Sequence, residues 1–333
     1  MLRNIINWFV ITTLMMPSLA WTATTQRAKP HSPPHKKTAI TRASHSKLAS
    51  TSSTKAMRPH KRTTSHSTLR MVNLQSDNVA EAPRLNSHSV LVIHGLTGET
   101  LYQKNTHQRM PIASITKLMT AIITLDAALP LDELITITDA EIDRVKGTSS
   151  RLAIGTTLSR RELLLLALMS SENRAAAALA RTFPGGTRSF IERMNRKALE
   201  LGMTETVFYD PTGLDMRNTS TAMDLARLVS AADHYALIRV FTTTQHYSVY
   251  STHNRHLHYK NSNALVRDGQ WEITLQKTGY IQEAGRCLVM QATVGTQPLI
   301  IVLLAANGSS ARTNDARAIK TWLESRPNNW LAG

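Results

Sequence analysis

The chain has 333 residues, of which 42% are hydrophobic and one is a cysteine. This length suits one large domain or two small ones, and the composition excludes a disulfide-stapled mini-protein and a polytopic membrane protein. Residues 1–75 carry 12 of the 39 Lys and Arg and no Asp or Glu, which leaves 27 basic against 23 acidic residues in the remainder. The formal net charge of +16 therefore belongs mostly to the N-terminal segment, and the folded part is expected to be nearly balanced.

The first twenty residues have the pattern of a secretory signal peptide. Arg3 provides a positive start, an apolar run spans Ile5 to Met16, and Pro17-Ser18-Leu19-Ala20 offers small residues for cleavage. An uncleaved membrane anchor is the alternative, although the run is short for a spanning helix, which needs about 20 residues. Either reading predicts an exported, periplasmic protein, in which the single Cys287 forms no internal disulfide and is buried.

Residues 21–80 are expected to form a disordered basic tether, because Ser, Thr, Lys, Arg, His and Pro predominate and large apolar side chains are scarce. Such a segment either adheres to an anionic wall or membrane surface or serves as a solvated spacer. Nucleic acid is not an expected partner outside the cytoplasm. Its five histidines have no Cys or acidic partners at ligand spacing, so they do not indicate a metal site.

Periodicity beyond residue 80 predicts strands at both ends of a helical middle. The expected strands are Ser89–His94, Thr100–Lys104, Glu272–Lys277, Arg286–Val294 and Pro298–Ala306. The expected helices are Leu118–Leu129, Arg161–Met169, Arg174–Phe183, Arg188–Leu201, Thr221–Ala232 and Thr313–Glu324. This order predicts an α+β domain over residues 81–327, with an antiparallel sheet, helices on both faces and an inserted helical lobe. Residues 328–333 would be a short tail.

A serine and a lysine at the start of the first long helix are candidates for nucleophilic catalysis. Ser114 and Lys117 are three residues apart, so a helix places both side chains on one face. Serine needs a base to remove its proton, and a lysine serves if burial and a second cation lower its pKa. The same spacing at Ser44/Lys47 and Ser52/Lys55 lies in the tether, where no fold would bury the lysine.

Two further motifs follow in order. Ser171-Glu172-Asn173 interrupts a predicted helix pair, and Lys277-Thr278-Gly279 is expected at the end of a strand. Ser76-Asp77-Asn78 matches the middle motif more literally, but it precedes Ser114 and is interpreted as a decoy.

These three motifs resemble the S-x-x-K, S-x-N and K-T-G signature of penicillin-binding proteins and serine β-lactamases. The stretches Pro111–Ala121, Leu163–Ala177, Asp210–Leu214 and Gln276–Met290 are similar to D-alanyl-D-alanine endopeptidases of the penicillin-binding protein seven type. The resemblance covers roughly residues 85–325. It implies a DD-peptidase fold, acylation of a serine by peptidoglycan stem peptides, and inhibition by β-lactams.

The chemistry and the resemblance together suggest a role for each residue. Ser114 would attack the D-Ala carbonyl, Lys117 would accept its proton, and Ser171 would relay a proton to the leaving amine. Asn173 would bind the substrate backbone or hold the lysine. Lys277, with Thr278 and Gly279, would bind substrate and provide the positive field that keeps Lys117 neutral. By resemblance, the oxyanion would be held by the backbone N–H groups of Ser114 and Tyr280. No metal or other cofactor is required.

Several alternatives remain open at this stage. A DD-carboxypeptidase differs only in what lies beyond the scissile bond, and the expected lack of a further C-terminal domain favours an endopeptidase. A β-lactamase is disfavoured because the chain lacks an E-x-x-L-N stretch between the second and third motifs. A non-catalytic wall-binding protein would not need the full set of catalytic side chains. His253, His256 and His258 have no acidic neighbour in sequence and indicate an exposed hairpin rather than a metal site.

Overall fold

The computed structural model describes residues 81–326. The expected signal peptide, basic tether, decoy Ser76-Asp77-Asn78 and C-terminal tail lie outside these residues. Within residues 81–326, no helix is both long and apolar enough to cross a membrane.

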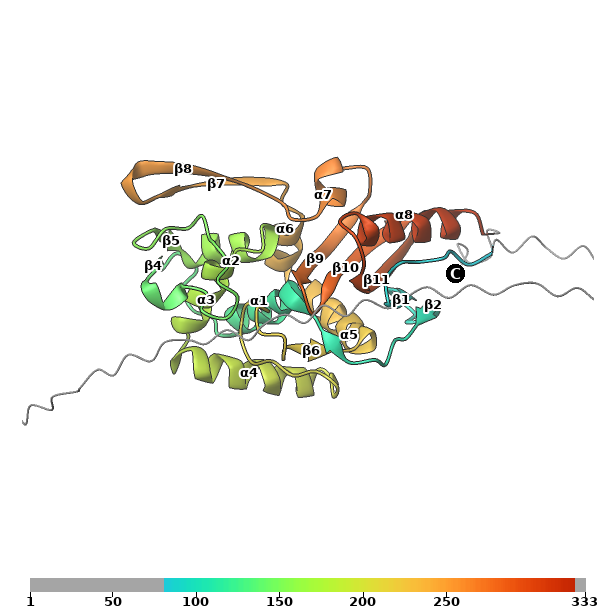
Figure 1. The fold of residues 1–333 in the computed structure, drawn as a ribbon, viewed down its shortest axis with the longest axis horizontal. Coiled ribbons are helices and arrows are strands. Elements are labelled where there is room, and N and C mark those ends of the chain that lie inside the picture. Colours follow the sequence, from blue (N-terminus) through green and yellow to red (C-terminus); the bar gives the residue numbers. More distant parts are fainter. Residues whose placement is uncertain (1–80, 327–333) are drawn as a thin grey trace, which may run out of the picture. The chain divides into compact units, whose positions relative to one another are not determined.

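A five-stranded antiparallel sheet in the order β2-β1-β11-β10-β9 forms the centre of the domain (Figure 1). Its strands are β1 (Ser89–His94), β2 (Thr100–Lys104), β9 (Ile273–Ile281), β10 (Gly285–Val294) and β11 (Gln297–Ala306). The two ends of the domain therefore share one sheet, as the chain order predicted. Three pairs of short strands lie outside it: β3 (Met110–Pro111) with β6 (Thr219–Ser220), β4 (Leu134–Thr136) with β5 (Thr157–Ser159), and β7 (His246–Ser251) with β8 (Arg255–Lys260).

Helices cover both faces of the sheet (Figure 1). The α-helices are α1 (Lys117–Asp126), α2 (Arg160–Met169), α3 (Asn173–Arg181), α4 (Gly186–Glu200), α5 (Ala222–Asp233), α6 (Ala236–Thr243), α7 (Ala264–Asp268) and α8 (Ala311–Glu324). Three short 3₁₀ helices are η1 (Ala113–Thr116), η2 (Asp139–Glu141) and η3 (Thr252–Asn254). Helix α8 packs on β10 and β11, whereas α5 packs on the other face, towards the lobe that includes α1 to α4.

The alternation of side chains along β11 explains why both faces are covered. Leu299, Ile301 and Leu303 belong to the core beneath α8. Ile300, Val302 and Leu304 belong to the larger core shared with the helical lobe. Because successive strand residues point to opposite faces, a continuous apolar run needs a cover on each side. Cys287 is fully buried in the larger core, as expected, and burial raises the pKa of its thiol to about 11.

Several element boundaries differ from the sequence expectation, and two of them have a clear physical cause. The first long helix ends at Asp126 rather than Leu129, because Ala128 adopts a left-handed backbone (φ 50°) and Pro130 cannot extend a helix. The Lys277-Thr278-Gly279 motif does not end its strand: β9 continues to Ile281, since the motif pairs with Val289, Leu288 and Cys287 of β10. The motif therefore lies inside a strand at the edge of the sheet.

Candidate active site

The nucleophile candidate lies in a tight turn rather than in the regular helix expected. Ser114 belongs to the 3₁₀ turn η1, and α1 begins at Lys117. The turn still brings the two side chains together, with Lys117 Nζ 2.9 Å from Ser114 Oγ. Ala113, immediately before the serine, has a φ of 48°, a strained conformation for a residue with a Cβ. The surroundings of the turn must therefore hold it in place.

Two glycines hold this turn by close backbone approach. A Cβ on Gly279 of β9 would lie 2.9 Å from the Ile112 carbonyl oxygen and 3.2 Å from Ser114 N. Gly213 approaches from the other side with a φ of 82°, and a Cβ there would overlap the Ala113 carbonyl. Only glycine fits at these positions without moving the turn. Gly279, the last residue of the third motif, thus helps to fix the position of Ser114.

The buried amino group of Lys117 meets acceptors from three parts of the chain. It donates to Asn173 Oδ1 at 2.7 Å and to the Thr212 carbonyl at 2.7 Å, beside its contact with Ser114. An amine that has lost one proton retains two donors and gains a lone pair. Neutral Lys117 can therefore donate to Asn173 and Thr212 and accept the Ser114 hydroxyl proton. Asn173 thus contacts the lysine and also lines the cleft, so both roles expected for it stay predictions.

Ser171 and Lys277 form a second polar contact next to the first. Lys277 is fully buried and donates to Ser171 Oγ at 3.0 Å and to the Thr278 carbonyl at 2.9 Å. Ser171 lies between α2 and α3 with a φ of 63°, so its backbone is also left-handed. Strain at a non-glycine residue costs about 1–3 kcal/mol and persists where surrounding contacts impose it.

A cleft of about 420 Å³ opens over these groups. Its walls include Ser114, Ser171, Asn173, Thr278, Gly279 and Tyr280, together with Thr148, Leu214 and Arg312. The two residues that the resemblance assigned to the oxyanion hole therefore lie at one cleft. Lys117 and Lys277 lie beneath its surface, with no exposed area.

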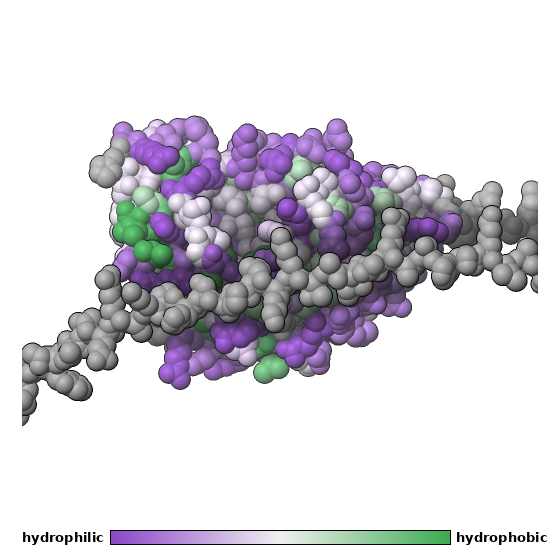
Figure 2. Space-filling view, viewed as in Figure 1, coloured by the Kyte–Doolittle hydropathy of each residue, from purple (hydrophilic) through white to green (hydrophobic). Residues whose placement is uncertain are grey.

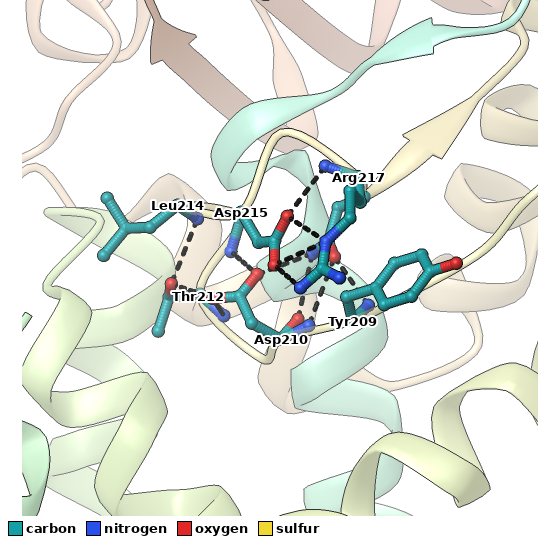
Figure 3. Close-up of polar contacts among 8 residues, drawn as sticks. Tyr209, Asp210, Thr212, Leu214, Asp215 and Arg217 are labelled. Carbon is teal, nitrogen blue, oxygen red and sulfur yellow. Dashed lines mark hydrogen bonds and ion pairs between the residues drawn. The ribbon is translucent and has the colours of Figure 1, made fainter. Parts of the chain in front are cut away.

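A loop centred on Asp210 supports the Thr212 carbonyl that contacts Lys117 (Figure 3). The Asp210 carboxylate accepts the backbone N–H groups of Thr212 and Gly213, each at 3.0 Å, and the Asn218 side-chain amide at 2.8 Å. It also accepts the Thr212 hydroxyl. Figure 3 shows the neighbouring Asp215 turned to Arg217 instead, with Nε–Oδ1 at 3.0 Å. Asp210 thus organises the loop, while Asp215 makes a separate surface pair.

The two buried lysines have neighbours of opposite charge, which affect their pKa values differently. Burial lowers the pKa of Lys117 to about 8, and the nearby carboxylates Asp210 and Glu172 limit that shift. Burial also lowers the pKa of Lys277 well below its ordinary value, with the charges of Lys117 and Arg312 adding to the effect. Lys277 is not among the charges that shift the pKa of Lys117 in the free protein, so the expectation that its field keeps Lys117 neutral stays a prediction. The carboxylates of Asp210 and Glu172 favour the ammonium form of Lys117, whereas the charges of Lys117 and Arg312 disfavour the ammonium form of Lys277.

An ion pair spans the two sides of the cleft mouth. Lys146 comes from the loop before β5 and pairs with Glu283 in the turn between β9 and β10. Lys146 lines the cleft, as does Gln282 next to Glu283. Both partners are partly exposed, so this contact is accessible to salt and to ligands.

Sequence reasoning gave no role to Asp210, Thr212, Glu172, Ser262 or Arg312. Ser262 Oγ lies 2.7 Å from Thr278 Oγ1, and Arg312 donates to the Gly279 carbonyl at 2.8 Å. The Asp210–Leu214 stretch, which resembles the endopeptidases, was the sequence signal for this loop. The contact between the Thr212 carbonyl and Lys117 depends on the fold and could not be read from it. Among residues 81–326, no group of three or more His, Cys, Asp or Glu side chains could hold a metal ion.

Comparison with known proteins identifies the family of this chain. The family model described as D-alanyl-D-alanine carboxypeptidase matches residues 76–308. The D-alanyl-D-alanine endopeptidase of Pseudomonas aeruginosa is 47% identical over 241 residues, which cover 72% of this chain and 78% of that protein. The Escherichia coli endopeptidase is 42% identical over 246 residues, covering 74% and 79% respectively.

Solved structures show the same fold. The Streptomyces K15 DD-transpeptidase superposes with a TM-score of 0.67 at 31% identity, covering 72% of this chain and 98% of that one. The family match spans well over half of the chain, and the endopeptidases are similar over most of their own length. The chain therefore belongs to the D-alanyl-D-alanine carboxypeptidase family of peptidases.

Proposed function

We propose that this protein is a serine DD-endopeptidase that hydrolyses D-alanyl cross-links in peptidoglycan through an acyl-enzyme and is inhibited by β-lactams. The observation that carries the proposal is the contact of Ser114 Oγ with the buried Lys117 amine at 2.9 Å, at the floor of a cleft shared with Ser171 and Thr278. A nucleophile, a base and a relay group meet where a peptide carbonyl can enter.

Acylation begins with the neutral form of Lys117. Its amine takes the Ser114 hydroxyl proton while Oγ forms a bond to the D-Ala carbonyl carbon, and the carbonyl electron pair moves to oxygen. The backbone N–H groups of Ser114 and Tyr280 would stabilise that oxyanion. Asn173 and Thr212 keep the amine oriented, since each accepts one of its hydrogens.

Collapse of the tetrahedral intermediate breaks the bond to nitrogen. The leaving amine needs a proton, and Ser171, whose hydroxyl contacts Lys277 and lines the cleft, would pass on the proton that Lys117 took from Ser114. This transfer returns Lys117 to its neutral form. Water then attacks the acyl ester, gives up a proton to the base and releases the D-Ala carboxyl group. Ser114 recovers its hydroxyl proton at this step, so the enzyme is regenerated.

The runner-up is a DD-carboxypeptidase, since the family model carries that description and a Streptomyces carboxypeptidase is 33% identical. The higher identity of the endopeptidases favours cross-link cleavage. The test incubates the purified chain with cross-linked muropeptide dimers and, separately, with monomers ending in D-Ala-D-Ala, and follows products by mass spectrometry. Faster release of monomers from dimers supports the proposal, and exclusive loss of terminal D-Ala supports the runner-up. Labelling by a fluorescent penicillin reports acylation independently of either reaction.

Export and surface adhesion complete the proposal. The pattern of residues 1–20 supports periplasmic localisation. The 11 Lys and Arg between residues 22 and 75 support adhesion to anionic wall or membrane material. Sacculus binding at low salt should weaken when residues 22–75 are deleted, while turnover of soluble muropeptides stays unchanged. Charge-driven binding is screened over a Debye length of about 8 Å at physiological salt, so binding through the segment should weaken as salt is added. If the full and the truncated chain bind sacculi equally at every salt concentration, the segment is a passive spacer.

A further inference from the structure

The β7–β8 hairpin carries an exposed face that the proposed reaction does not use. Its cross-strand pairs are His246 with Lys260, Ser248 with His258, and Tyr250 with His256. All six side chains are exposed, whereas the alternate residues, among them Val249, Leu257 and Tyr259, are buried towards the domain. We call these six residues the hairpin face. At about 3.3 Å per residue, it extends roughly 20 Å from end to end.

Three rings form a continuous surface on this face. The Tyr250 and His256 rings stack with centroids 4.8 Å apart and an interplanar angle of 30°. His256 meets His258 edge-on at 4.2 Å. Tyr250 retains 61% of its surface exposed, so these rings pack against one another without being covered. An exposed aromatic surface of this kind suits a ligand with flat, partly apolar faces such as a sugar ring.

Charge on this face is of one sign. The sequence contains no Asp or Glu between Asp233 and Asp268. The acidic groups near the hairpin lie behind it: Glu162 contacts Tyr247, and Glu172 lies close enough to the buried Tyr259 to act on its pKa. Within the part of the chain that the structure describes, Lys260 has no ion-pair partner. The space-filling view shows mainly hydrophilic residues along the edge where the hairpin lies (Figure 2).

The hairpin is fixed to the walls of the catalytic cleft. Arg151 donates to the His258 carbonyl at 2.7 Å and stacks over the Tyr259 ring at 3.9 Å. Two residues after β8, Ser262 bonds to Thr278 at 2.7 Å, and its backbone N–H donates to the Met169 carbonyl at the end of α2. A polymer held on the hairpin face would therefore be held at a fixed distance from Ser171 and Thr278.

We propose that the hairpin face docks a carboxylate-bearing glycan strand of the peptidoglycan sacculus, an inference that rests on the proposed function. Sugar rings would pack on Tyr250 and His256, and carboxylates of the stem peptides would approach Lys260. Charge complementarity favours this occupant, because Lys260 carries a positive charge that no acidic side chain of the hairpin face offsets. A membrane is the poorer fit, since the hairpin face lacks the long aliphatic side chains that enter a bilayer.

The experiment compares one enzyme on two forms of its substrate. The full chain, a Tyr250→Ala/His256→Ala/His258→Ala variant and a Lys260→Glu variant are assayed on intact sacculi and on soluble muropeptide dimers at one salt concentration. Arg188→Glu is the matched control, since Arg188 is highly exposed on α4 and its reversal changes charge equally. Both hairpin variants should lose about fivefold in rate on sacculi and retain full rate on dimers, with Arg188→Glu unchanged on both.

Other outcomes overturn the inference. Unchanged rates on sacculi mean that the face docks nothing, and equal losses on sacculi and dimers mean that the hairpin acts through Thr278. Binding to vesicles containing phosphatidylglycerol that the triple variant abolishes, with sacculus rates intact, assigns the face to a membrane. If the unaltered chain cleaves no dimers, the proposed function fails. Co-sedimentation of the same variants with sacculi then decides the docking proposal separately.

Discussion

Two lysines equally removed from solvent occupy opposite electrostatic surroundings. Lys117 lies among acceptors and near two carboxylates, whereas Lys277 lies near two cations. Burial lowers the pKa of both, but the neighbours hold the pKa of Lys117 near 8 and lower that of Lys277 further. The difference shows that burial alone does not select the base. In the free protein, the neighbouring carboxylates favour the ammonium form of Lys117, which must lose a proton before acylation.

A ligand carboxylate offers a way to reverse this preference. A D-Ala-D-Ala terminus and a penicillin both carry a carboxylate close to the scissile nitrogen. Placed at Thr278, which lines the cleft next to Lys277, that charge would favour an ammonium on Lys277. The new positive charge would lower the pKa of Lys117, and its amine would become available to Ser114. The positive field first expected of Lys277 would then arise on substrate binding.

The largest expected effect comes from removing the Ser114 hydroxyl, the proposed nucleophile. Ser114→Ala should abolish labelling by fluorescent penicillin and cleavage of muropeptide dimers, because no other hydroxyl within residues 81–326 hydrogen-bonds to the Lys117 amine. Gel fluorescence and product analysis measure the two effects. Ser76→Ala, in the decoy motif, is the control and should change neither. Labelling that survives in Ser114→Ala would place the nucleophile elsewhere.

The next largest effect is expected from arginine substitutions, which should distinguish the roles of the two lysines. Lys117→Arg keeps a cation that cannot be deprotonated, so penicillin acylation should fall by at least about a hundredfold. Lys277→Arg also keeps a cation, which is the form that substrate binding requires there, and its loss should stay within about tenfold. Stopped-flow acylation rates and circular dichroism, as a check on folding, give the comparison. Equal losses in two folded variants would contradict distinct roles.

The pH dependence of kcat/KM should reflect the lysine that accepts the proton. Since the pKa of Lys117 is about 8, lowering the pH below 8 protonates the base. The rate should then fall by about tenfold per pH unit, and it should level off above pH 8. Measurements of kcat/KM between about pH 5.5 and 9.5, in buffers of equal ionic strength, test whether the rate falls towards acid. A profile that rises towards acid would exclude neutral Lys117 as the base.

The smallest expected effect concerns the carboxylate behind the Thr212 loop. Asp210 raises the pKa of Lys117, so Asp210→Asn should move the acidic limb of the profile to lower pH. The amide keeps an acceptor oxygen for the loop but removes the charge. Asp215→Asn is the matched control, because Asp215 pairs with Arg217 and contributes no shift to Lys117. If the acidic limb of the Asp210→Asn profile does not move, Asp210 does not influence the pKa of Lys117.

Sequence reasoning located the elements that depend on local pattern. The sheet strands, the helices around Ser171 and the spacing of Ser114 to Lys117 follow from periodicity, and the structure brings these motifs to one cleft. It could not locate features that arise from tertiary packing. The left-handed backbone at Ala113 and Ser171 is imposed by neighbours, and the cations near Lys277 come from distant elements. The uninterrupted course of β9 through Gly279 likewise depends on pairing with β10.

The Lys146–Glu283 pair makes the edge of the cleft more adjustable than its floor. The floor is set by close backbone contacts at Gly279, while the pair at the mouth consists of two long, partly exposed side chains. Rotations of such side chains take picoseconds to nanoseconds, far less time than a catalytic cycle. A bulky, branched strand can therefore part the mouth without deforming the chemistry beneath it. The polar contact at this edge of the cleft can therefore rearrange while the position of Ser114 stays fixed.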